Sequence, residues 1–403
     1  MFKKTPIAYG LRLVSTLFPA QKPLVFSGAG SVAKLADHMV DGGSRRPLLV
    51  TDAFLLQNGM LDEVLTQLRD LGCAVTIFDG IIPNPTFAVV EAGLAQSRAG
   101  QCDAVLAIGG GSAIDAAKVI AAAHTDPRPL SRLVGNLKIK VPPLPFFVAP
   151  TTSGTGSETT VAAVISDTRT HKKQFFVSPK LVPIATALDP DLLKSLPPAM
   201  TAAVGMDAFT HAVEAYTSRN TFDDTDRDAR MAIALLVKYL PVVVQDGGNL
   251  VAREKVALAS FLAGYAFTKA SLGYVHAISH QISAHYNTPH GLANAIILPR
   301  VLRFNKPAVA DRLAALERML DPNASGGDAA LADRFIARVD ALEHQIGIPD
   351  HLADLQPKDY DKIAQDALAE ARVSYAVPRV MKKHHVQRVL EATASGALDV
   401  SFL

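Results

Sequence analysis

The sequence predicts two domains of different class: an α/β domain with a parallel sheet over residues 1–196, and an all-helical domain over residues 197–403. Short apolar runs alternate with helix-like stretches in the first half, and this alternation favours parallel strands with helices packed on the faces of the sheet. The pattern changes at Ser195-Leu196-Pro197-Pro198, after which helical periodicity dominates and β-branched runs are few. We therefore expect the domain boundary near residue 196.

Four apolar runs in the first half are expected to form buried strands. They are 47–52 (PLLVTD), 73–80 (CAVTIFDG), 103–112 (DAVLAIGGGS) and 144–152 (LPFFVAPTT). The stretch after the first run carries Leu61, Val64, Leu65 and Leu68 on one face, as an amphipathic helix requires. Ligands of such sheets bind beyond the carboxyl ends of the strands. The loops after these strands are therefore the first candidates for a binding site.

The composition excludes some classes of function. The 403 residues carry a formal net charge of +2 without a long basic block, which gives no electrostatic case for binding nucleic acid. Cys73 and Cys102 lie far apart without a CxxC motif, as expected of a reduced, cytosolic protein. An apolar run after Lys3 and Lys4 weakly resembles a signal peptide, but Arg12 interrupts it. No run has the length of a membrane span, and we expect a cytoplasmic protein.

The loops after the strands favour a dinucleotide ligand. Gly109-Gly110-Gly111-Ser112 follows a strand and opens a helix, so that a phosphate can approach bare backbone at a positive helix end. The segment 150–158 (PTTSGTGSE) adds hydroxyl groups and two more glycines. The alternatives are a tight turn for the first loop and a flexible polar loop for the second. Four loops at four strand ends together indicate a long crevice, as in a Rossmann-like domain.

Two further side chains lie in these loops. Asp52 ends the first strand, where a carboxylate can accept both hydroxyl groups of an adenosine ribose and repel a 2′-phosphate. A helix N-cap is an equally good interpretation of this residue. Asn84 lies between two prolines in 79–86 (DGIIPNPT), the loop after the second strand.

The helical half contains candidates for metal ligands. Asp207 and His211 are four residues apart, as are His276 and His280, and His290 follows an Asn-Thr-Pro turn. Residues at i and i+4 share one helix face and can converge on one point. An aspartate and several histidines suit a divalent metal, iron(II) or zinc. The alternative, histidines satisfied in the core or at the surface, is harder to sustain for both clusters together.

At this point the sequence resembles a known family, the iron-containing (group III) alcohol dehydrogenases. The resemblance covers nearly the whole chain. It depends on five motifs in order: DGIIPNPT, IGGGSAIDAAK, PTTSGTGSE, GMDAFTHAVEAY and VHAISHQISAHYNTPHGLANAIILP. It implies the dehydroquinate synthase-like fold, an NAD-dependent activity and an iron(II) cofactor, with zinc as the alternative metal.

The resemblance also implies roles for individual residues. The implied metal ligands are Asp207, His211, His276 and His290. His280 is implied to face substrate and nicotinamide, which makes it the candidate for proton relay, whereas His285 is expected to be structural. Lys173 matches a lysine that reaches a cofactor ribose, although Lys172 is adjacent. The implied cofactor-binding residues are Asp52, Asn84, Gly110, Gly111, Ser112, Asp115, Thr151, Thr152, Thr160 and Lys173.

The expected reaction is hydride transfer between NAD and a small primary alcohol or diol, with the metal acting as a Lewis acid on the alcohol oxygen. Phe267, Leu272 and Tyr274 are candidate pocket walls, with ordinary core packing as the alternative. A zinc-dependent glycerol dehydrogenase or a dehydroquinate synthase-like enzyme is an alternative of the same fold. A metal-dependent hydrolase is a remote alternative. The resemblance suggests a homodimer or a higher homo-oligomer.

Overall fold

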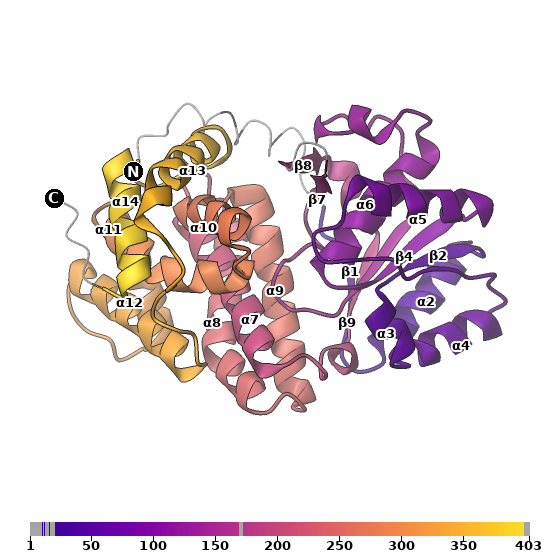
Figure 1. Cartoon of the computed structure of the whole chain (residues 1–403). Helices are drawn as coiled ribbons and strands as arrows, with labels where there is room; N and C mark the ends of the chain where they lie inside the picture. Colours follow the sequence, from indigo (N-terminus) through magenta and orange to yellow (C-terminus); the bar gives the residue numbers. More distant parts are fainter. Residues whose placement is uncertain (1–9, 11, 13–15, 17–20, 169–171, 399–403) are drawn as a thin grey trace. The chain divides into compact units, whose positions relative to one another are not determined.

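The computed structural model describes residues 10, 12, 16, 21–168 and 172–398. Its backbone contacts divide the chain into two compact units, Pro19–Leu196 and Pro197–Leu403, with Met1–Phe18 grouped with the second unit. Figure 1 shows a unit of mixed helices and strands and a unit built of helices. The predicted classes of the two halves, α/β followed by all-helical, are confirmed.

The predicted N-terminal domain of residues 1–196 differs from this division at its start. The guanidinium group of Arg12 donates a hydrogen bond to the carbonyl oxygen of Thr221 at 3.0 Å and lies 4.5 Å from the ring centroid of Phe222. Both partners belong to the helical unit. Arg12 therefore ties its part of the N-terminal segment to the helical unit instead of to the sheet.

Within the described residues, the α/β unit contains a six-stranded parallel sheet in the order β1-β9-β6-β4-β2-β3. The predicted strands correspond to β2, β3, β4 and β6, whereas β1 and β9 were not predicted. The strands are β1 (Leu24–Ser27), β2 (Pro47–Val50), β3 (Thr76–Phe78), β4 (Ala104–Gly109), β6 (Phe146–Pro150) and β9 (Ala185–Leu188).

Helices cover both faces of this sheet (Figure 1). Val105 and Ala107 of β4 belong to one core and Leu106 and Ile108 to another, because successive side chains point to opposite faces. Two-sided burial explains why the strands are continuous apolar runs. The helices are α2 (Ser31–Asp41), α3 (Ala53–Gln57), α4 (Asp62–Asp70), α5 (Phe87–Ala99) and α6 (Gly111–Thr125), with the 3₁₀ turns η1 (Leu130–Arg132), η2 (Pro179–Leu181) and η3 (Pro190–Leu192).

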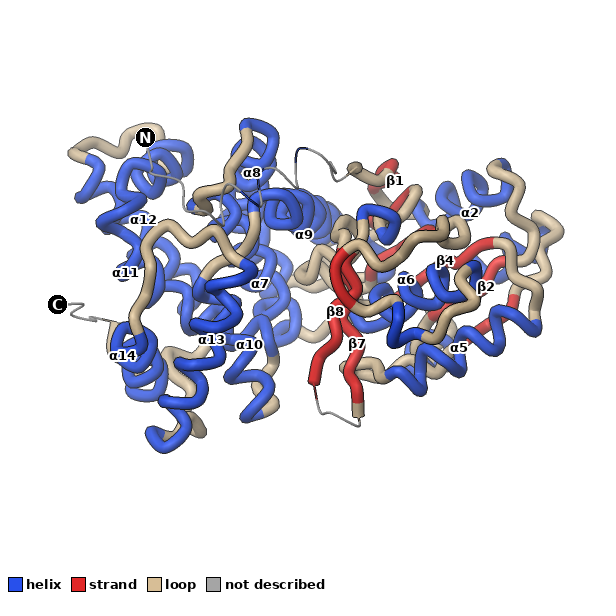
Figure 2. Tube along the Cα trace, turned by 90° about the horizontal axis from the view of Figure 1, so that it is seen from above, coloured by secondary structure: helices blue, strands red, loops and turns tan. Residues whose placement is uncertain are grey.

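A second, smaller sheet lies in the same unit. It has the order β5-β8-β7, and β7 and β8 pair antiparallel as two neighbouring strands (Figure 2). Asp115 of α6 accepts a hydrogen bond from the backbone of Val164 in β7 at 2.9 Å, which joins this sheet to the glycine-loop helix. The strands are β5 (Gly135–Asn136), β7 (Ala162–Asp167) and β8 (Lys172–Val177).

The described residues of the helical unit form helices around one hydrophobic core, and α7 packs against α8, α9 and α11. Gly205 of α7 allows close approach to α8, since a Cβ atom there would lie 2.3 Å from a Cδ atom of Leu240. The helices are α7 (Pro198–Thr217), α8 (Asp223–Gln245), α9 (Leu250–Ala270), α10 (Tyr274–Tyr286), α11 (His290–Leu320), α12 (Asp328–Gln345), α13 (Tyr360–Ser374) and α14 (Lys383–Ser395), with the 3₁₀ turn η4 (Pro357–Asp359).

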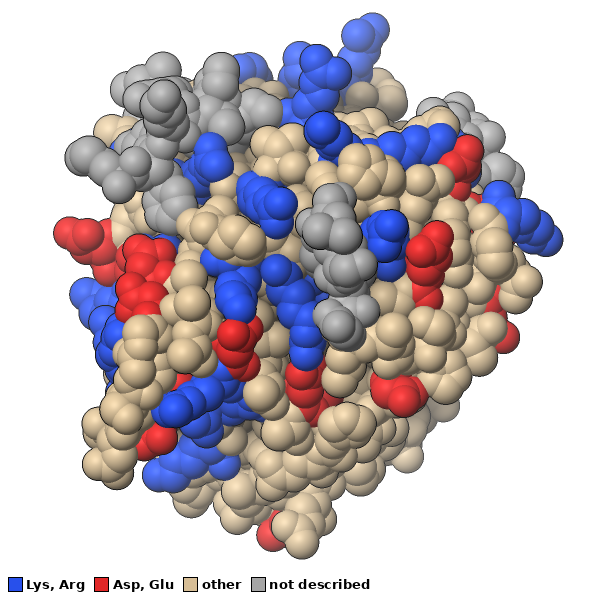
Figure 3. Space-filling view, turned by 90° about the vertical axis from the view of Figure 1, so that its left-hand side faces the viewer, with Lys and Arg blue, Asp and Glu red and all other residues tan. Residues whose placement is uncertain are grey.

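Acidic and basic side chains are mixed over the face shown in Figure 3. Exposed ion pairs of the helical unit include Lys306 with Asp333 at 2.5 Å and Lys362 with Asp366 at 2.9 Å. No single helix among the described residues is long and apolar enough to cross a membrane; α9 and α10 meet the length and composition criteria only as a pair bent by 105°.

Candidate active site

Three helices of the helical unit bring the predicted metal ligands together. Asp207 and His211 lie one turn apart on α7, and His276 is the third residue of α10. His290 is the first residue of α11. Between α10 and α11, Asn287 adopts the left-handed conformation with φ of 54°, which asparagine tolerates better than most residues. This turn brings His290 back to the start of α10.

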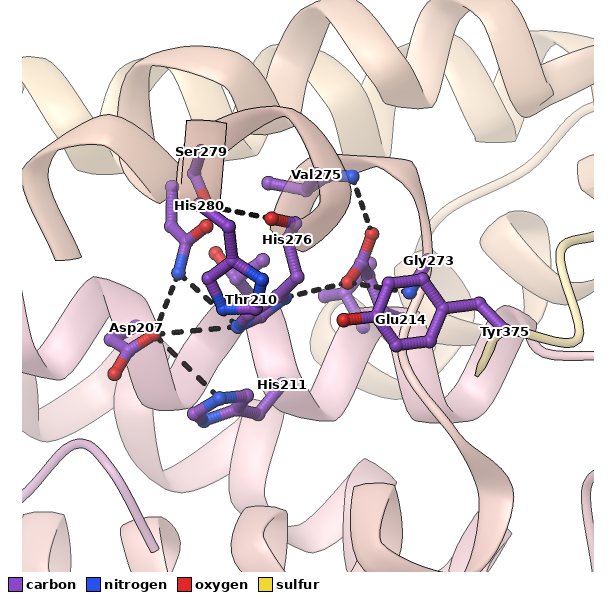
Figure 4. A network of polar contacts seen from close by, with 12 residues as sticks. Asp207, Thr210, His211, Glu214, Gly273, Val275, His276, Ser279, His280 and Tyr375 are labelled. Carbon is purple, nitrogen blue, oxygen red and sulfur yellow. Dashed lines mark hydrogen bonds and ion pairs between the residues drawn. The ribbon is translucent and has the colours of Figure 1, made fainter. Parts of the chain in front are cut away.

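Asp207 is the common neighbour of the three histidines, and Figure 4 shows it beside two of them, His211 and His276. Its Oδ1 is 3.6 Å from Nε2 of His276 and 3.7 Å from Nε2 of both His211 and His290. In the part of the chain that the structure describes, ligand atoms of Asp207, His276 and His290 all lie within 4.8 Å of one another. His211 is outside that group of three, and its ring stacks on His276 with centroids 4.6 Å apart.

The geometry and charge of this cluster fit a divalent metal ion. Four atoms that each lie about 2.1 Å from one cation in a tetrahedron are about 3.4 Å apart, close to the separations around Asp207. Burial opposes ionisation of Asp207, but His211, His290 and His276 hold the pKa of its carboxyl group well below the usual range. Burial likewise opposes charge on His276, yet the carboxylates of Asp207 and Glu214 raise its pKa to about 9. The two carboxylates thus favour positive charge on His276, whereas burial lowers the pKa of His290 well below its usual value, and a neutral imidazole is the form that binds a metal ion.

Two buried side chains that were not predicted as site residues contact the cluster. Nδ2 of Asn294 is 2.7 Å from Oδ1 of Asp207, 3.2 Å from Nε2 of His276 and 3.0 Å from Nε2 of His290. Glu214 lies 2.7 Å from Nδ1 of His276. A sequence signal existed for each, because Asn294 follows His290 by four residues and Glu214 is part of the stripe of Asp207 on α7.

His280, the predicted proton-relay residue, has a carboxylate partner of its own. Its Nδ1 is 2.7 Å from Oε1 of Glu370 on α13, and its ring stacks on His290 with centroids 5.0 Å apart. Glu370 also accepts hydrogen bonds from Gln281 at 2.8 Å and Tyr375 at 2.6 Å. Burial opposes the charge of Glu370, but its bond to His280 keeps the carboxyl pKa below the usual value. Burial, with the neighbouring Glu370, raises the pKa of Tyr375 well above its usual value.

The other candidate residues of the helical unit, Phe267, Tyr274 and His285, lie in different surroundings. Phe267 stacks on His211 with ring centroids 4.2 Å apart, so it lies beside the predicted metal ligands. Tyr274 was predicted as a pocket wall, but it is buried in the core and its hydroxyl oxygen accepts a hydrogen bond from the backbone of Met381 at 3.0 Å. The core-packing alternative is therefore correct for Tyr274. His285 is exposed near the end of α10.

In the α/β unit, the glycine loop joins β4 to α6 as predicted. Gly110 is the N-cap of α6, and Gly111 and Ser112 form its first turn. A Cβ atom on Gly110 would lie 3.4 Å from the side chain of Thr152, and one on Gly111 would lie 2.9 Å from that of Thr155. The loop after β6 therefore packs directly on the glycine loop, and both lie at the carboxyl ends of neighbouring strands.

The threonines of the second loop have different surroundings. The backbone N–H of Thr151 donates to the carbonyl oxygen of Gly109 at 3.0 Å, whereas Thr152 is partly exposed. The hydroxyl group of Thr160 is buried and accepts a hydrogen bond from the ammonium group of Lys118 at 2.8 Å. Asp115, also predicted to bind cofactor, uses Oδ2 to accept from β7, and burial raises its pKa. Lys118 was not predicted, because a lysine inside a helix is ordinarily a surface residue.

Three predicted cofactor residues lie further along the loops. Asp52 is the N-cap of α3, with Oδ1 accepting from the backbone of Leu55 at 3.0 Å, so the N-cap alternative is correct for one carboxylate oxygen. Asn84 is exposed in the loop after β3, with φ of 53°. Lys173 is exposed on β8, opposite Ser166 of β7. The structure thus leaves Asn84 and Lys173 at the surface of the unit.

Comparisons with known proteins identify the family. A family model described as "Iron-containing alcohol dehydrogenase" matches residues 23–190, and one described as "Fe-containing alcohol dehydrogenase family, C-terminal" matches residues 201–394. The chain is 40% identical to 1,3-propanediol dehydrogenase of Klebsiella pneumoniae over 359 residues, 88% of this chain and 92% of that protein. It is 34% identical to NAD-dependent methanol dehydrogenase of Bacillus methanolicus over 372 residues, 92% of this chain and 97% of that protein.

A solved structure agrees with these matches. The crystal structure of a 1,3-propanediol oxidoreductase superposes with a TM-score of 0.90 at 38% identity, covering 93% of this chain and 99% of the other. The dehydrogenase interpretation is therefore correct, and the hydrolase alternative is not. The two family models together match most of the chain, and the structure brings Asp207, His276 and His290 together as a possible metal site. The chain therefore belongs to the iron-containing alcohol dehydrogenases, oxidoreductases that use NAD and iron(II) to interconvert alcohols and aldehydes.

Proposed function

We propose that this enzyme interconverts a small primary alcohol or diol and its aldehyde, with Asp207, His211, His276 and His290 as the ligands of iron(II). One observation carries the proposal: a single carboxylate oxygen lies within 3.7 Å of three imidazole Nε2 atoms. Relatives named for 1,3-propanediol and methanol support the substrate class, since both compounds are short primary alcohols. When bound, iron(II) supplies Lewis acidity to the substrate oxygen, and NAD accepts or donates the hydride.

A residue of the chain is needed to carry the proton that leaves the alcohol. His280 is proposed to relay the proton that leaves the alcohol hydroxyl group. Its Nδ1 is bonded to the carboxylate of Glu370, which leaves Nε2 as the ring nitrogen available to accept or donate a proton. The flat stacking of His280 on His290 fixes the ring beside the metal ligands.

The α/β unit is proposed to bind NAD at the carboxyl ends of its strands. Gly110 and Gly111 expose backbone at the N-terminus of α6, where the helix dipole favours a pyrophosphate. Ser112 lies in the first turn of α6, directly after β4, and Thr151 and Thr152 lie in the loop after β6. We further propose that the enzyme is cytoplasmic, in keeping with its buried free cysteines, and that it forms a homodimer or a higher homo-oligomer.

The experiment is an anaerobic assay with metal-stripped protein. Iron(II) or zinc is restored separately, and NADH absorbance is followed with short primary alcohols, diols and aldehydes. His276→Ala is expected to remove the metal-dependent rate, whereas His285→Ala, a matched change at an exposed position of the same helix, is expected to retain it. Turnover that persists in His276→Ala would contradict the proposed metal site. NADH binding without turnover of any of these substrates would contradict the substrate class alone.

A further inference from the structure

We propose that Glu214 is the positioning residue of the metal site: its carboxylate fixes the His276 ring so that Nε2 faces Asp207. The inference rests on the proposed role of His276 as a metal ligand. It concerns a residue that no motif of the sequence assigned to the site. Glu214 acts through His276 and through the first turn of α10, not through contact with substrate or cofactor.

The contacts of Glu214 carry the proposal (Figure 4). Oε2 lies 2.7 Å from Nδ1 of His276 and accepts a hydrogen bond from the backbone N–H of Gly273 at 2.9 Å. Oε1 accepts from the backbone N–H of Val275 at 2.8 Å. Glu214 and His276 are both buried, with 7% and 1% of their surfaces exposed. A carboxylate with these partners is satisfied without water, and every partner lies at or near the start of α10.

The contact with His276 decides which ring nitrogen can bind a metal. A carboxylate only accepts hydrogen bonds, so Nδ1 of His276 must carry the proton that they share. Nε2 is then the nitrogen available for coordination, and it lies 3.6 Å from Oδ1 of Asp207. Metal-bound histidines in proteins ordinarily donate their second ring N–H to such a partner, which fixes the ring and raises its basicity. Glu214 meets that requirement from α7, the helix that also carries Asp207.

The backbone contacts place the whole first turn of α10. Gly273 is the N-cap of this helix and has no side chain to accept from the free N–H groups. The carboxylate of Glu214 takes that role from another helix, at the positive end of the α10 dipole. A Cβ atom on Gly273 would lie 2.6 Å from Oε1 of Glu214, so a larger residue there would displace the carboxylate. His276, three residues later, is therefore positioned through both its ring and its backbone.

Two substitutions test this arrangement. In Glu214→Gln, an NH₂ group replaces one acceptor oxygen and the negative charge is lost, so either the Val275 amide or Nδ1 of His276 with the Gly273 amide loses its acceptor, and the oxygen that remains is a weaker acceptor than a carboxylate. Loss of such a partner costs about 10–100-fold in metal affinity, and we expect a change in this range. Gly273→Ala is also expected to weaken metal binding, because its methyl group would displace the Glu214 carboxylate without removing it. Glu317→Gln is the matched control, because Glu317 is also buried in the helical unit but pairs with Arg338.

The readout is the Zn²⁺ affinity of metal-free protein, measured by competition with a chromophoric chelator. Thermal unfolding of each metal-free variant checks that it is folded. The proposal is supported if Glu214→Gln and Gly273→Ala bind Zn²⁺ about 10–100-fold more weakly than the wild type and Glu317→Gln keeps the wild-type affinity. Wild-type affinity in Glu214→Gln overturns it. A wild-type protein that fails to bind Zn²⁺ would instead refute the proposed metal site, and the inference with it.

A second measurement needs no variant of Glu214. NMR spectra of Zn²⁺-loaded protein with ¹⁵N-labelled histidine report which nitrogen of each ring carries a proton, and His276→Asn identifies the signal of that residue. The arrangement requires a protonated Nδ1 that exchanges slowly with water, and a proton-free Nε2. A proton on Nε2 of His276 would overturn the proposal.

Discussion

The buried carboxyl group of Glu158 makes the stability of the α/β unit depend on pH in a way that one substitution can reveal. Glu158 ends the second cofactor loop, is 1% exposed, and its Oε1 has no hydrogen-bond partner among the described residues. Burial raises the pKa of this group to about 7, although a hydrogen bond to its own backbone and the charge of Lys118 partly offset that effect. Glu158→Gln keeps the shape of the side chain and removes the ionisation.

The sign and size of the effect follow from linkage. The ordinary pKa is 4.5 and the folded value is about 7, so the folded protein retains a proton that the unfolded chain releases between these pH values. The wild-type unit therefore loses stability as the pH rises through this window, by about 2.5 kcal/mol between about pH 5 and pH 8. The glutamine variant has no such loss.

Hydrogen–deuterium exchange of peptides from β4 and β6 measures this difference within the α/β unit alone, since core amides report the opening of the structure around them. Opening free energies of the two proteins are compared from about pH 5 to pH 8 after correction for intrinsic exchange rates, and the advantage of Glu158→Gln is expected to grow with pH. Glu91→Gln, at an exposed position of α5, controls for the change in net charge. A difference that is constant with pH, or that shrinks as the pH rises, would refute the reasoning.

Three other predictions concern the helical unit and its metal. Gly205→Ala is expected to destabilise the protein by about 1–3 kcal/mol, because the new methyl group meets Leu240, and the same change should cost less when it is made in a Leu240→Ala background, as thermal unfolding of the double-mutant cycle measures. Glu370→Gln is expected to lower kcat by about 10-fold or more while Zn²⁺ affinity stays at the wild-type value, since its partner is His280 and not a proposed ligand; equal losses in both quantities would contradict this. Removal of metal by a chelator is expected to lower Tm, and metal restored at about 100 times its Kd should recover about 2.7 kcal/mol; an unchanged Tm would count against a site that binds only the folded protein.

The elements that could be predicted from the sequence are those marked by a pattern within a few neighbouring residues. Strands β2, β4 and β6 are continuous apolar runs, and the pair Asp207 and His211 is recognisable from spacing alone. Strand β1 was missed because its four residues have a partly exposed pattern, and its place beside β9 depends on pairing with a segment about 160 residues away. Tyr274 was assigned to a pocket because its hydroxyl partner, the backbone of Met381, lies 107 residues further along the chain.

The site partners were missed for the same physical reason. Glu214 contacts the start of α10 across 59 to 62 residues, and Glu370 contacts His280 across 90. The spacing on α7 places Glu214 on the same stripe as Asp207, but which carboxylate meets which imidazole is decided by how α7, α10 and α13 pack. The position of Lys118 is similar, because a lysine on α6 is buried only where the carbonyl oxygens of Thr160 and Ala162 converge on its ammonium group.

Glu214 and Glu370 account for the different roles that we propose for the two histidines one turn apart on α10. The rings of His276 and His280 have centroids 5.9 Å apart, and both present Nδ1 to a glutamate. Glu214 is buried on α7, so it directs His276 toward Asp207 and the proposed metal. Glu370 is on α13, accepts a hydrogen bond from Tyr375 and holds the His280 ring through Nδ1, in keeping with the proposed role of His280 in proton transfer. Under the proposed roles, His276 binds metal and His280 relays a proton because carboxylates from two different helices, α7 and α13, hold the two rings.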